Sequence, residues 1–540
     1  MKWNSFAKLG GVAAFAALVL AGCGSSNSFN GGSSKTLNWS ISTELPTMDI
    51  SKSTDLYSGQ TINATGEGLL RYTGNSKVGP GVATSYKVSN GGKTWTFNLR
   101  KSQWSNGTPV TANDFVYSWQ RTVTPKTASQ YAYIFANIQN AAQISAGKMA
   151  PSKLGVKASG NNKLVVNLVK PQSYFKYMVA MSTFFPMNKA QVTKEGSKYG
   201  TNDASLLSNG PYVLKNWNST KDSWYLSKNP KYWNAKNVKL SKINFTVIKD
   251  PSTALNSYNG NKIDYTTLNG VQVKQYKNKP GFENHAEAST FYMVMNQKKD
   301  PIFKSADARK AISLAIDKHH LVNTVLADGS LFPKGFVASQ MITKNGTDFA
   351  DAASVPEAVS YNMKQAKALW AKAEKATGQK SFNFNYVADD TTTSKNISQY
   401  VQNQLEQLPG VKVNNQNLPF ANRLNRQTKG QFDITVAGWI ADYPDPSDFL
   451  DLMTSKNSYN YGHWSNAQYD ALVKKSESTD ANNEAARWSD MVQAEKVLMK
   501  DQGVVPLYQQ SLATLTRSNV KGVLFIPTSP EIDWTSAYMK

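Results

Sequence analysis

The stretch with the most groups able to hold a ligand is residues 433–451, Asp-Ile-Thr-Val-Ala-Gly-Trp-Ile-Ala-Asp-Tyr-Pro-Asp-Pro-Ser-Asp-Phe-Leu-Asp. It predicts a short apolar strand from Ile434 to Ala437 that breaks at Gly438, followed by Trp439 and Asp442. A glycine at a strand end lets another backbone approach closely, and the nearby carboxylate supplies a fixed negative charge. One interpretation is therefore that a cationic group docks at Asp442 beside an aromatic wall, although the residue pattern by itself favours the simpler alternative. The alternative is a strand-to-loop corner in which the aspartate only forms a turn.

Residue patterns typical of catalysis are missing from the chain. The four histidines are scattered, and there is no His-Glu-x-x-His, Gly-x-Ser-x-Gly, Walker loop or Gly-x-Gly-x-x-Gly. His319 and His320 are adjacent, and adjacent residues of a helix point about 100° apart, so both cannot face one metal ion. We predict a protein that is not an enzyme and uses no metal or cofactor. A peptidase or glycosidase built from ordinary Asp and Glu pairs is the alternative.

The composition predicts a large globular protein with an excess of positive charge. The 540 residues are 40% hydrophobic and 18% charged, which is enough for two or three domains. Sixty Lys and Arg against 37 Asp and Glu give a net charge of +23. Such an excess is found in proteins that bind nucleic acids, anionic membranes or polyanionic walls. Because the lysines are spread along the chain without a dense basic run, we predict no nucleic acid partner.

Residues 1–22 are predicted to be a signal peptide. Lys2 and Lys8 precede an apolar run of about a dozen residues, which is short for a membrane span but right for a signal sequence. The run ends in Leu-Ala-Gly-Cys, which resembles a lipoprotein processing site, and Cys23 is the only cysteine of the chain. We expect a lipid on Cys23, followed by a flexible tether over residues 23–35 that is rich in Gly, Ser and Asn. The predicted location is the extracellular face of a cell membrane.

Several segments carry clear signals of regular structure. Residues 94–99 alternate like a strand, Asn106-Gly107 is a turn pair, and Thr111 with Asp114 forms a helix start signal. Residues 306–326 have apolar positions at helical spacing, and 505–508 form a short apolar strand.

These segments also carry a family resemblance. Gly438-Trp-Ile-Ala-Asp-Tyr443 resembles the amino-terminus-binding segment of oligopeptide-binding lipoproteins of ABC importers. Further landmarks follow in the family's order and resemble family-5 extracellular solute-binding proteins: 95–100, 104–109, 111–121, 208–217, 229–233, 258–265 and 309–317.

The resemblance implies a fold and its division into parts. It implies an α/β fold like the type II periplasmic binding proteins, with two lobes, an extra third domain and a ligand cleft between the lobes. Lobe I is expected to be discontinuous, the extra domain II is expected to cover residues 71–208, and lobe II is expected to cover 286–504. The segments expected for lobe I are 36–70, 209–285 and 505–540.

The resemblance also implies a binding site for peptides. Asp442 is expected to bind the α-amino group of the peptide, and Gly438 and Trp439 are expected to form the backbone and aromatic walls beside it. The remaining residues expected at the peptide are Ile440, Tyr443, Tyr117 and Tyr292.

Two departures from the family affect how the rest of the ligand is held. Relatives have an arginine at the position of Val436, and they bridge two cysteines at the positions of Ser289 and Ile440. Rules for the capture of the peptide carboxylate therefore do not transfer, and we predict that Arg426 takes this role.

The partners implied are short extended peptides and the permease and ATPase subunits of an ABC importer, with the receptor itself a monomer. Whether the peptides serve nutrition or signalling stays open. The alternatives are another solute on the same fold, namely an oligosaccharide, a nickel chelate or a cell-wall peptide, and a surface adhesin whose basic face holds polyanions.

If a lipid on Cys23 anchors the protein, replacing Cys23 should change the cellular fraction in which the protein is found. Cys23→Ala removes the thiol that would carry the lipid, so the protein should leave the membrane fraction for the medium or stay unprocessed. Fractionation of cells and immunoblotting measure this. A variant that is processed and still sediments with membranes would show that Cys23 is not the anchor.

Overall fold

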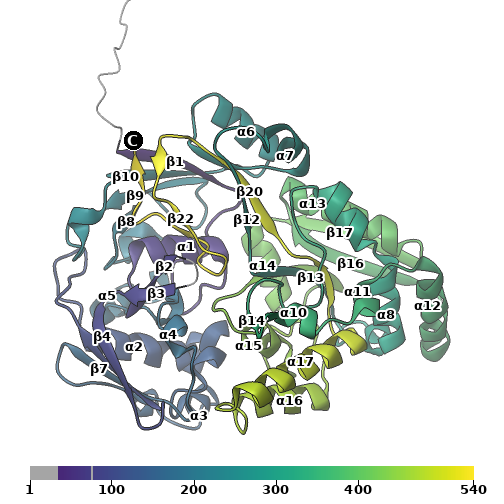
Figure 1. Ribbon diagram of the computed structural model, residues 1–540, viewed down its shortest axis with the longest axis horizontal. Helices are drawn as coiled ribbons and strands as arrows, with labels where there is room; N and C mark the ends of the chain where they lie inside the picture. Colours follow the sequence, from purple (N-terminus) through teal and green to yellow (C-terminus); the bar gives the residue numbers. More distant parts are fainter. Residues whose placement is uncertain (1–34, 75–76) are drawn as a thin grey trace, which may run out of the picture. The chain divides into compact units, whose positions relative to one another are not determined.

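The computed structural model describes residues 35–74 and 77–540 (Figure 1). The predicted signal peptide, the predicted tether up to residue 34 and Cys23 lie outside the described residues. Within the described ranges, no helix is long and apolar enough to cross a membrane.

A seven-stranded sheet gathers strands from distant parts of the chain. β1 pairs in parallel with β10 over all six of its residues, and Trp39 of β1 stacks on Tyr265 of β11 with ring centroids 3.6 Å apart. Trp534 meets Trp39 edge-on, so the C-terminal segment closes the core of this sheet. The strands in spatial order are β12 (Phe282–Ala286), β20 (Ser511–Thr516), β11 (Tyr265–Thr267), β1 (Thr36–Ile41), β10 (Lys242–Val247), β9 (Ser223–Lys228) and β8 (Tyr212–Lys215).

A second, five-stranded sheet carries the strand with the predicted ligand-binding motif. Helices α8 (Ala306–Ala315), α12 (Met363–Thr377) and α13 (Thr392–Leu405) lie beside it in Figure 1, and α12 packs on α8. The strands in spatial order are β17 (Val411–Leu418), β16 (Phe382–Asp389), β18 (Ile434–Ile440), β13 (Ser289–Met295) and β19 (Val505–Tyr508). Because β19 pairs with β13, the boundary predicted at residue 505 separates β19 from the sheet to which it belongs.

Residues 71–208 contribute a smaller four-stranded sheet and the helix that packs on it. Its order is β4 (Ala83–Ser89), β5 (Thr94–Leu99), β7 (Lys163–Asn167) and β6 (Val156–Ala158), and the predicted strand at 94–99 is confirmed as β5. Helix α2 (Ala112–Val123) begins where the sequence predicts, because the Asp114 carboxylate accepts a hydrogen bond from the Thr111 backbone N–H at 2.7 Å.

Two short connections join the seven-stranded and five-stranded sheets. Glu287 and Ala288 link β12 to β13, and Gln509 and Gln510 link β19 to β20. The two connections touch, since the Glu287 N–H donates to the Gln510 carbonyl at 3.3 Å. Such paired crossings concentrate any backbone rotation between two sheets in a few residues.

Two predicted elements differ in the structure. The motif strand does not break at Gly438: β18 continues to Ile440, because β13 pairs with it residue by residue as far as Ser289. The predicted helix over 306–326 is interrupted at Ile316, whose extended backbone ends α8, and a short α-helix and a π-helix follow.

Ser289 and Ile440, at which the family resemblance implies a cysteine pair in other members, face each other in the β13–β18 ladder. The sheet pairing therefore holds these two positions together in this chain without a covalent bond.

The hydrogen bonds of Gln509 allow a prediction of how much the connections between the sheets contribute to the free energy of unfolding. Its buried side-chain amide donates to the carbonyls of Glu287 (2.8 Å) and Ser339 (3.0 Å) and accepts from the Ser339 N–H (2.9 Å). Gln509→Ala leaves these buried groups without partners, so the free energy of unfolding should fall on the order of 3 kcal/mol. Urea denaturation followed by fluorescence measures the change. The control Gln407→Ala removes an exposed helix-end amide and should change it by less than about 0.5 kcal/mol; equal effects would contradict the prediction.

Candidate functional site

A cleft of two adjoining chambers lies against the five-stranded sheet. The first chamber has a volume of about 1410 Å³ and the second about 1570 Å³, both including space open to solvent. Eight residues line both chambers, so the chambers meet there: Leu56, Tyr57, Phe291, Asp389, Phe420, Arg423, Gly438 and Gln510. We call this shared wall the neck. The size suits a ligand larger than a single amino acid.

One edge of β18 is open toward the cleft. β18 pairs with β13 along its whole length but with β16 only through Ile434 and Thr435. The Ala441 N–H donates to Ala288 on the β13 side at 2.8 Å, and the backbone groups of alternate residues in a strand point to the same edge. The backbone groups of Val436, Gly438 and Ile440 therefore point to the opposite edge, and all three residues line the cleft. An unpaired strand edge of this kind is a template for an added extended chain.

Gly438 is required at this edge for a steric reason. A Cβ atom at this position would lie 2.6 Å from the Phe291 ring, which stacks on Tyr508 with centroids 4.7 Å apart. The absence of a side chain thus leaves space both for Phe291 and for a chain running along the neck.

Asp442 is a buried carboxylate without a cation. Its residue is 5% exposed and lines the first chamber, and its Oδ2 atom has no hydrogen-bond partner. Among the described residues, no lysine, arginine or histidine forms an ion pair with Asp442. Burial raises the pKa of Asp442 to about 7, and a hydrogen bond from Tyr131 opposes this shift. The carboxylate is therefore stabilised when a cation enters the chamber.

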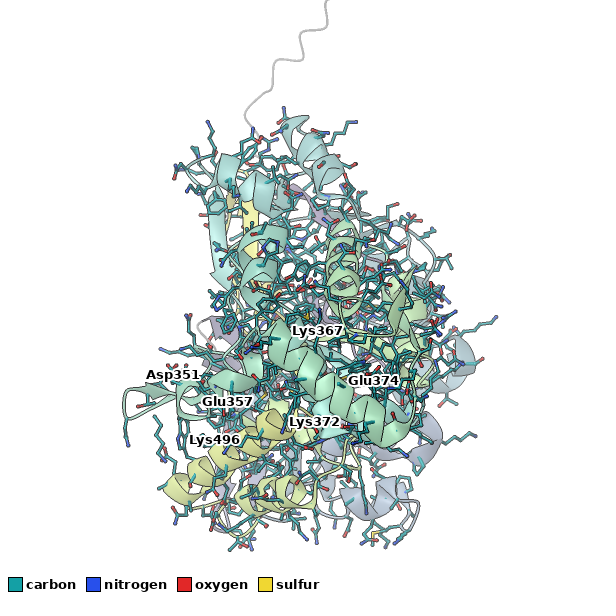
Figure 2. The ribbon with its side chains drawn as sticks, turned by 90° about the vertical axis from the view of Figure 1, so that its right-hand side faces the viewer. Asp351, Glu357, Lys367, Lys372, Glu374 and Lys496 are labelled. Atoms are coloured by element: carbon teal, nitrogen blue, oxygen red, sulfur yellow. The ribbon has the colours of Figure 1, made fainter. Side chains whose placement is uncertain are left out.

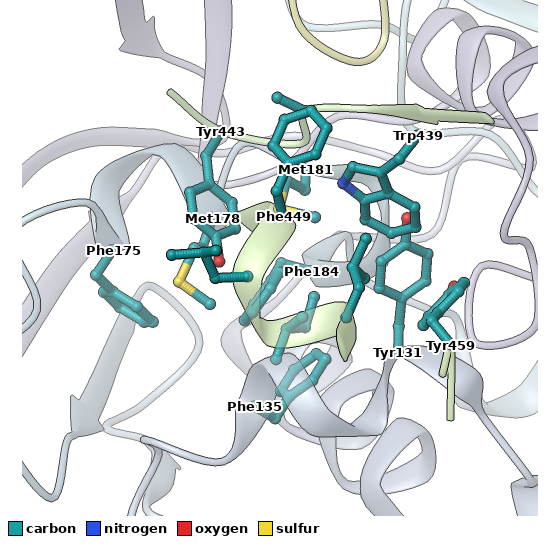
Figure 3. Close-up of a cluster of buried hydrophobic side chains, with 14 of the residues drawn as sticks. Tyr131, Phe135, Phe175, Met178, Met181, Phe184, Trp439, Tyr443, Phe449 and Tyr459 are labelled. Carbon is teal, nitrogen blue, oxygen red and sulfur yellow. The ribbon is translucent and has the colours of Figure 1, made fainter. Parts of the chain in front are cut away.

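Asp448 fixes the position of the Asp442 segment. One of its carboxylate oxygens accepts from the Trp439 indole N–H at 2.8 Å and from the Asp442 backbone N–H at 2.9 Å. Burial, and after it the charge of Asp442, raises the pKa of Asp448. Trp439 packs against Tyr459 and Tyr131 with centroids 5.0 and 6.3 Å apart, and Figure 3 shows these three rings grouped together. The aromatic faces form the wall beside the carboxylate.

The structure brings most of the predicted site residues together. Asp442, Gly438, Trp439, Ile440 and Tyr292 all line the first chamber. Tyr443 lies directly behind this wall, buried and stacked on Tyr174 at 4.9 Å, so it supports the site without lining it.

Two predicted residues lie elsewhere. Tyr117 packs against the core of the seven-stranded sheet and lines neither chamber. Arg426 donates to Gln416 and also lines neither chamber. Both belong to amphipathic helices, and a residue's face on a helix is decided by packing: Arg423, one turn before Arg426 on α14 (Phe420–Thr428), is the residue that reaches the neck.

Sequence reasoning missed several residues of the site. Asp448 lies inside the motif, and its spacing of six from Asp442 was available as a signal. Tyr131, Asp389 and Arg423 come from distant segments with no motif around them, so only the folded chain shows that they line the cleft.

The histidine pair predicted not to bind metal has other partners. The His319 ring stacks on Phe332 and the His320 ring on Tyr400. Over residues 35–74 and 77–540, no three His, Cys, Asp or Glu side chains are grouped so as to hold a metal ion.

Comparison with known proteins identifies the relatives of this chain. Residues 77–461 match the model described as bacterial extracellular solute-binding proteins, family 5, middle region. A dipeptide-binding protein of Lactococcus lactis is 33% identical over the full length of both chains. The solved structure of Listeria monocytogenes OppA bound to peptide has a TM-score of 0.90 and 36% identity and covers 94% of this chain and 100% of that chain.

Two structures of one relative differ in their likeness to this chain. A structure of the Escherichia coli murein tripeptide-binding protein MppA has a TM-score of 0.84, at 31% identity and covering 93% of this chain and 98% of that one. The unliganded open form of MppA has a TM-score of only 0.61, at 30% identity and covering 94% of this chain and 98% of that one. The arrangement described here is thus unlike that open form.

The raised pKa of Asp442 predicts how stability changes with pH. The native carboxyl binds its proton more tightly than the unfolded one, so the empty protein should lose stability as the pH rises from about 4 to above 7. Asp442→Asn removes the charge, so this variant should be more stable than the native protein at pH 8 and equally stable at pH 4. Denaturant midpoints at both pH values, measured on ligand-free protein, check this. If the charge of the native Asp442 carboxylate is already compensated, the native protein and the variant will differ in stability by the same amount at pH 4 and at pH 8. That result would contradict the prediction.

Proposed function

Because the chain belongs to the family-5 bacterial extracellular solute-binding proteins, we propose that it is a peptide receptor that delivers its ligand to an ABC importer. This family has the type II periplasmic-binding fold, with two lobes and a third domain, and its members bind solutes. Relatives of this chain are named as dipeptide- and oligopeptide-binding proteins, which supports a peptide as the ligand here.

The observation that carries the proposal is the position of Asp442 at the end of the open edge of β18. The uncompensated carboxylate suits the ammonium group of a peptide, and the backbone groups of Val436, Gly438 and Ile440 suit the backbone of an extended chain. Main-chain recognition depends little on side chains, so a receptor built in this way accepts many sequences.

We propose further that the receptor is anchored at the extracellular face of the membrane by a lipid on Cys23. The support is the sequence Leu-Ala-Gly-Cys at residues 20–23, which resembles a lipoprotein processing site. A Gly- and Ser-rich segment of this composition is typical of a tether, and about a dozen such residues would span roughly 20 Å between the lipid and the folded part.

The alternatives from sequence are less well supported by the site. The buried carboxylate of Asp442, which has no cationic partner among the described residues, favours an amine over a neutral sugar. For the adhesin, Figure 2 shows one face on which the exposed Lys367 and Lys372 lie together with the exposed Asp351 and Glu357, so the charge there is mixed.

Removing the charge at Asp442 tests the function. Asp442→Asn should weaken the binding of a peptide with a free amino group by roughly 30- to 4000-fold, because breaking one buried charge pair costs on the order of 2–5 kcal/mol. Acetylating the peptide's amino group should weaken binding to the native protein similarly, yet weaken binding to the variant little further. Calorimetry of the four combinations forms a double-mutant cycle.

The control is Asp351→Asn, which neutralises an exposed aspartate paired with Lys334 and away from the cleft. It should leave affinity and the effect of acetylation unchanged. If Asp442→Asn and acetylation weaken binding additively, the Asp442 carboxylate and the amino group of the peptide do not meet. The amino terminus is then held elsewhere.

A further inference from the structure

We propose that Arg423 holds the terminal carboxylate of short peptides whose amino group is at Asp442, and that it thereby selects ligand length. This inference rests on the proposed function and adds a second fixed point to the ligand. β18 itself carries no cationic side chain from Ile434 to Ile440, so a carboxylate beside it needs a partner from another element.

Arg423 lies where a chain leaving the first chamber must pass. It belongs to the neck, together with Gly438 of β18. Along β18 the lining changes from Asp442 and Ile440 in the first chamber, through Gly438 in the neck, to Val436 in the second. A ligand that runs along the open edge of β18 therefore has Asp442 at one end and the neck at the other.

The guanidinium of Arg423 is held in place by hydrogen bonds that use only some of its N–H donors. Its Nε and Nη2 donate to the two carboxylate oxygens of Asp389 at 2.8 and 3.2 Å, and its Nη1 donates to the Gln427 side chain at 2.6 Å. An arginine has five N–H donors, so these three bonds leave two for a ligand. Arg423 also packs over the Phe420 ring at 4.9 Å, which fixes the plane of the group.

A carboxylate entering this cleft requires a cation. The described lining contains the carboxylates Asp55, Asp389 and Asp442 in the first chamber, and Asp328 and Glu531 are added in the second. An anion among these groups is repelled and loses its hydration, unless a positive group pairs with it. Arg423 is only 8% exposed, so pairing with it takes place largely away from screening water.

Lys249 is the other cation of the described lining, and it is a weaker candidate. It lines only the second chamber and binds two carboxylates, Asp390 at 2.9 Å and Glu44 at 3.6 Å. Two negative charges already compensate its single positive charge. Arg423 has one carboxylate partner, Asp389, and a planar guanidinium that can bind a second carboxylate.

The geometry sets the length of the ligand that both groups can hold. Gly438 and Asp442 are four residues apart and β18 ends at Ile440, so at a rise of about 3.3 Å per residue the neck lies at most roughly 13 Å from the amino-terminal site. A peptide of about four residues fills this span. A peptide several residues longer continues into the second chamber, and its carboxylate passes Arg423.

The test is a double-mutant cycle between Arg423→Gln and amidation of the carboxyl end of a tetrapeptide with a free amino group. Amidation should weaken binding to the native protein by about 30-fold or more, and Arg423→Gln should weaken binding of the free acid similarly. The variant should bind the amide almost as well as the free acid. For a peptide of eight residues, amidation should change the affinity of both proteins less than threefold.

Two further variants keep the result interpretable. Arg426→Gln, one turn along α14 and outside the cleft lining, should retain the full effect of amidation. Arg423→Gln combined with Asp389→Asn removes both charges of the neck pair, so it excludes an effect of leaving Asp389 unpaired, and it should again be insensitive to amidation.

The outcomes separate this inference from the proposed function. If Arg423→Gln keeps the effect of amidation while Asp442→Asn cancels the effect of acetylation, the receptor binds peptides but the carboxylate is held elsewhere. If Arg426→Gln is the variant that cancels the effect of amidation, the arginine predicted from sequence is the partner and Arg423 is overturned. If no tetrapeptide binds to the native protein, the proposed function itself has failed.

Discussion

The burial of the Asp442 carboxylate without a cation is the constraint on which the site depends. A carboxylate in such surroundings is costly unless it is protonated or paired, and its pKa of about 7 reflects that cost. The surrounding structure maintains the arrangement: Asp448 fixes Trp439 and the Asp442 backbone, and Tyr72 donates to the Asp442 carbonyl at 2.9 Å. A cationic group of a ligand would remove the cost of this unpaired charge, and the energy released would add to the binding free energy.

The site lies between two sheets that are joined by few connections. The five-stranded sheet supplies the open edge of β18, while Tyr57 and Ser529 reach the cleft from segments associated with the seven-stranded sheet. In the described part of the chain, only the connections at 287–288 and 509–510 join the strands of the two sheets directly. A ligand held by both sides stabilises the arrangement in which they meet. The low likeness to the open, unliganded form of MppA agrees with this description.

Charge is distributed unequally between the chain as a whole and its cleft. The chain carries a net charge of +23, yet the described cleft lining has five carboxylates against the two cations Arg423 and Lys249. A negative cleft favours the amino end of a peptide at Asp442. The compensated pair of Arg423 and Asp389 then gives a carboxylate one place where donors remain. In the proposed binding mode, the two ends of a peptide would be distinguished by electrostatics.

The sequence by itself determined the local elements and the amino-terminal half of the site. Alternation predicted β5, a helix start signal predicted α2, and the spacing of Gly438, Trp439 and Asp442 placed a carboxylate beside a wall, because all of these depend on residues close together in the chain. Only the tertiary structure decided the rest. The continuation of β18 through Gly438 and the place of β19 depend on pairing with β13, more than 100 residues away. The choice of Arg423 over Arg426 for the neck depends on which face of α14 packs against β16 and β17, and a local pattern does not contain that information.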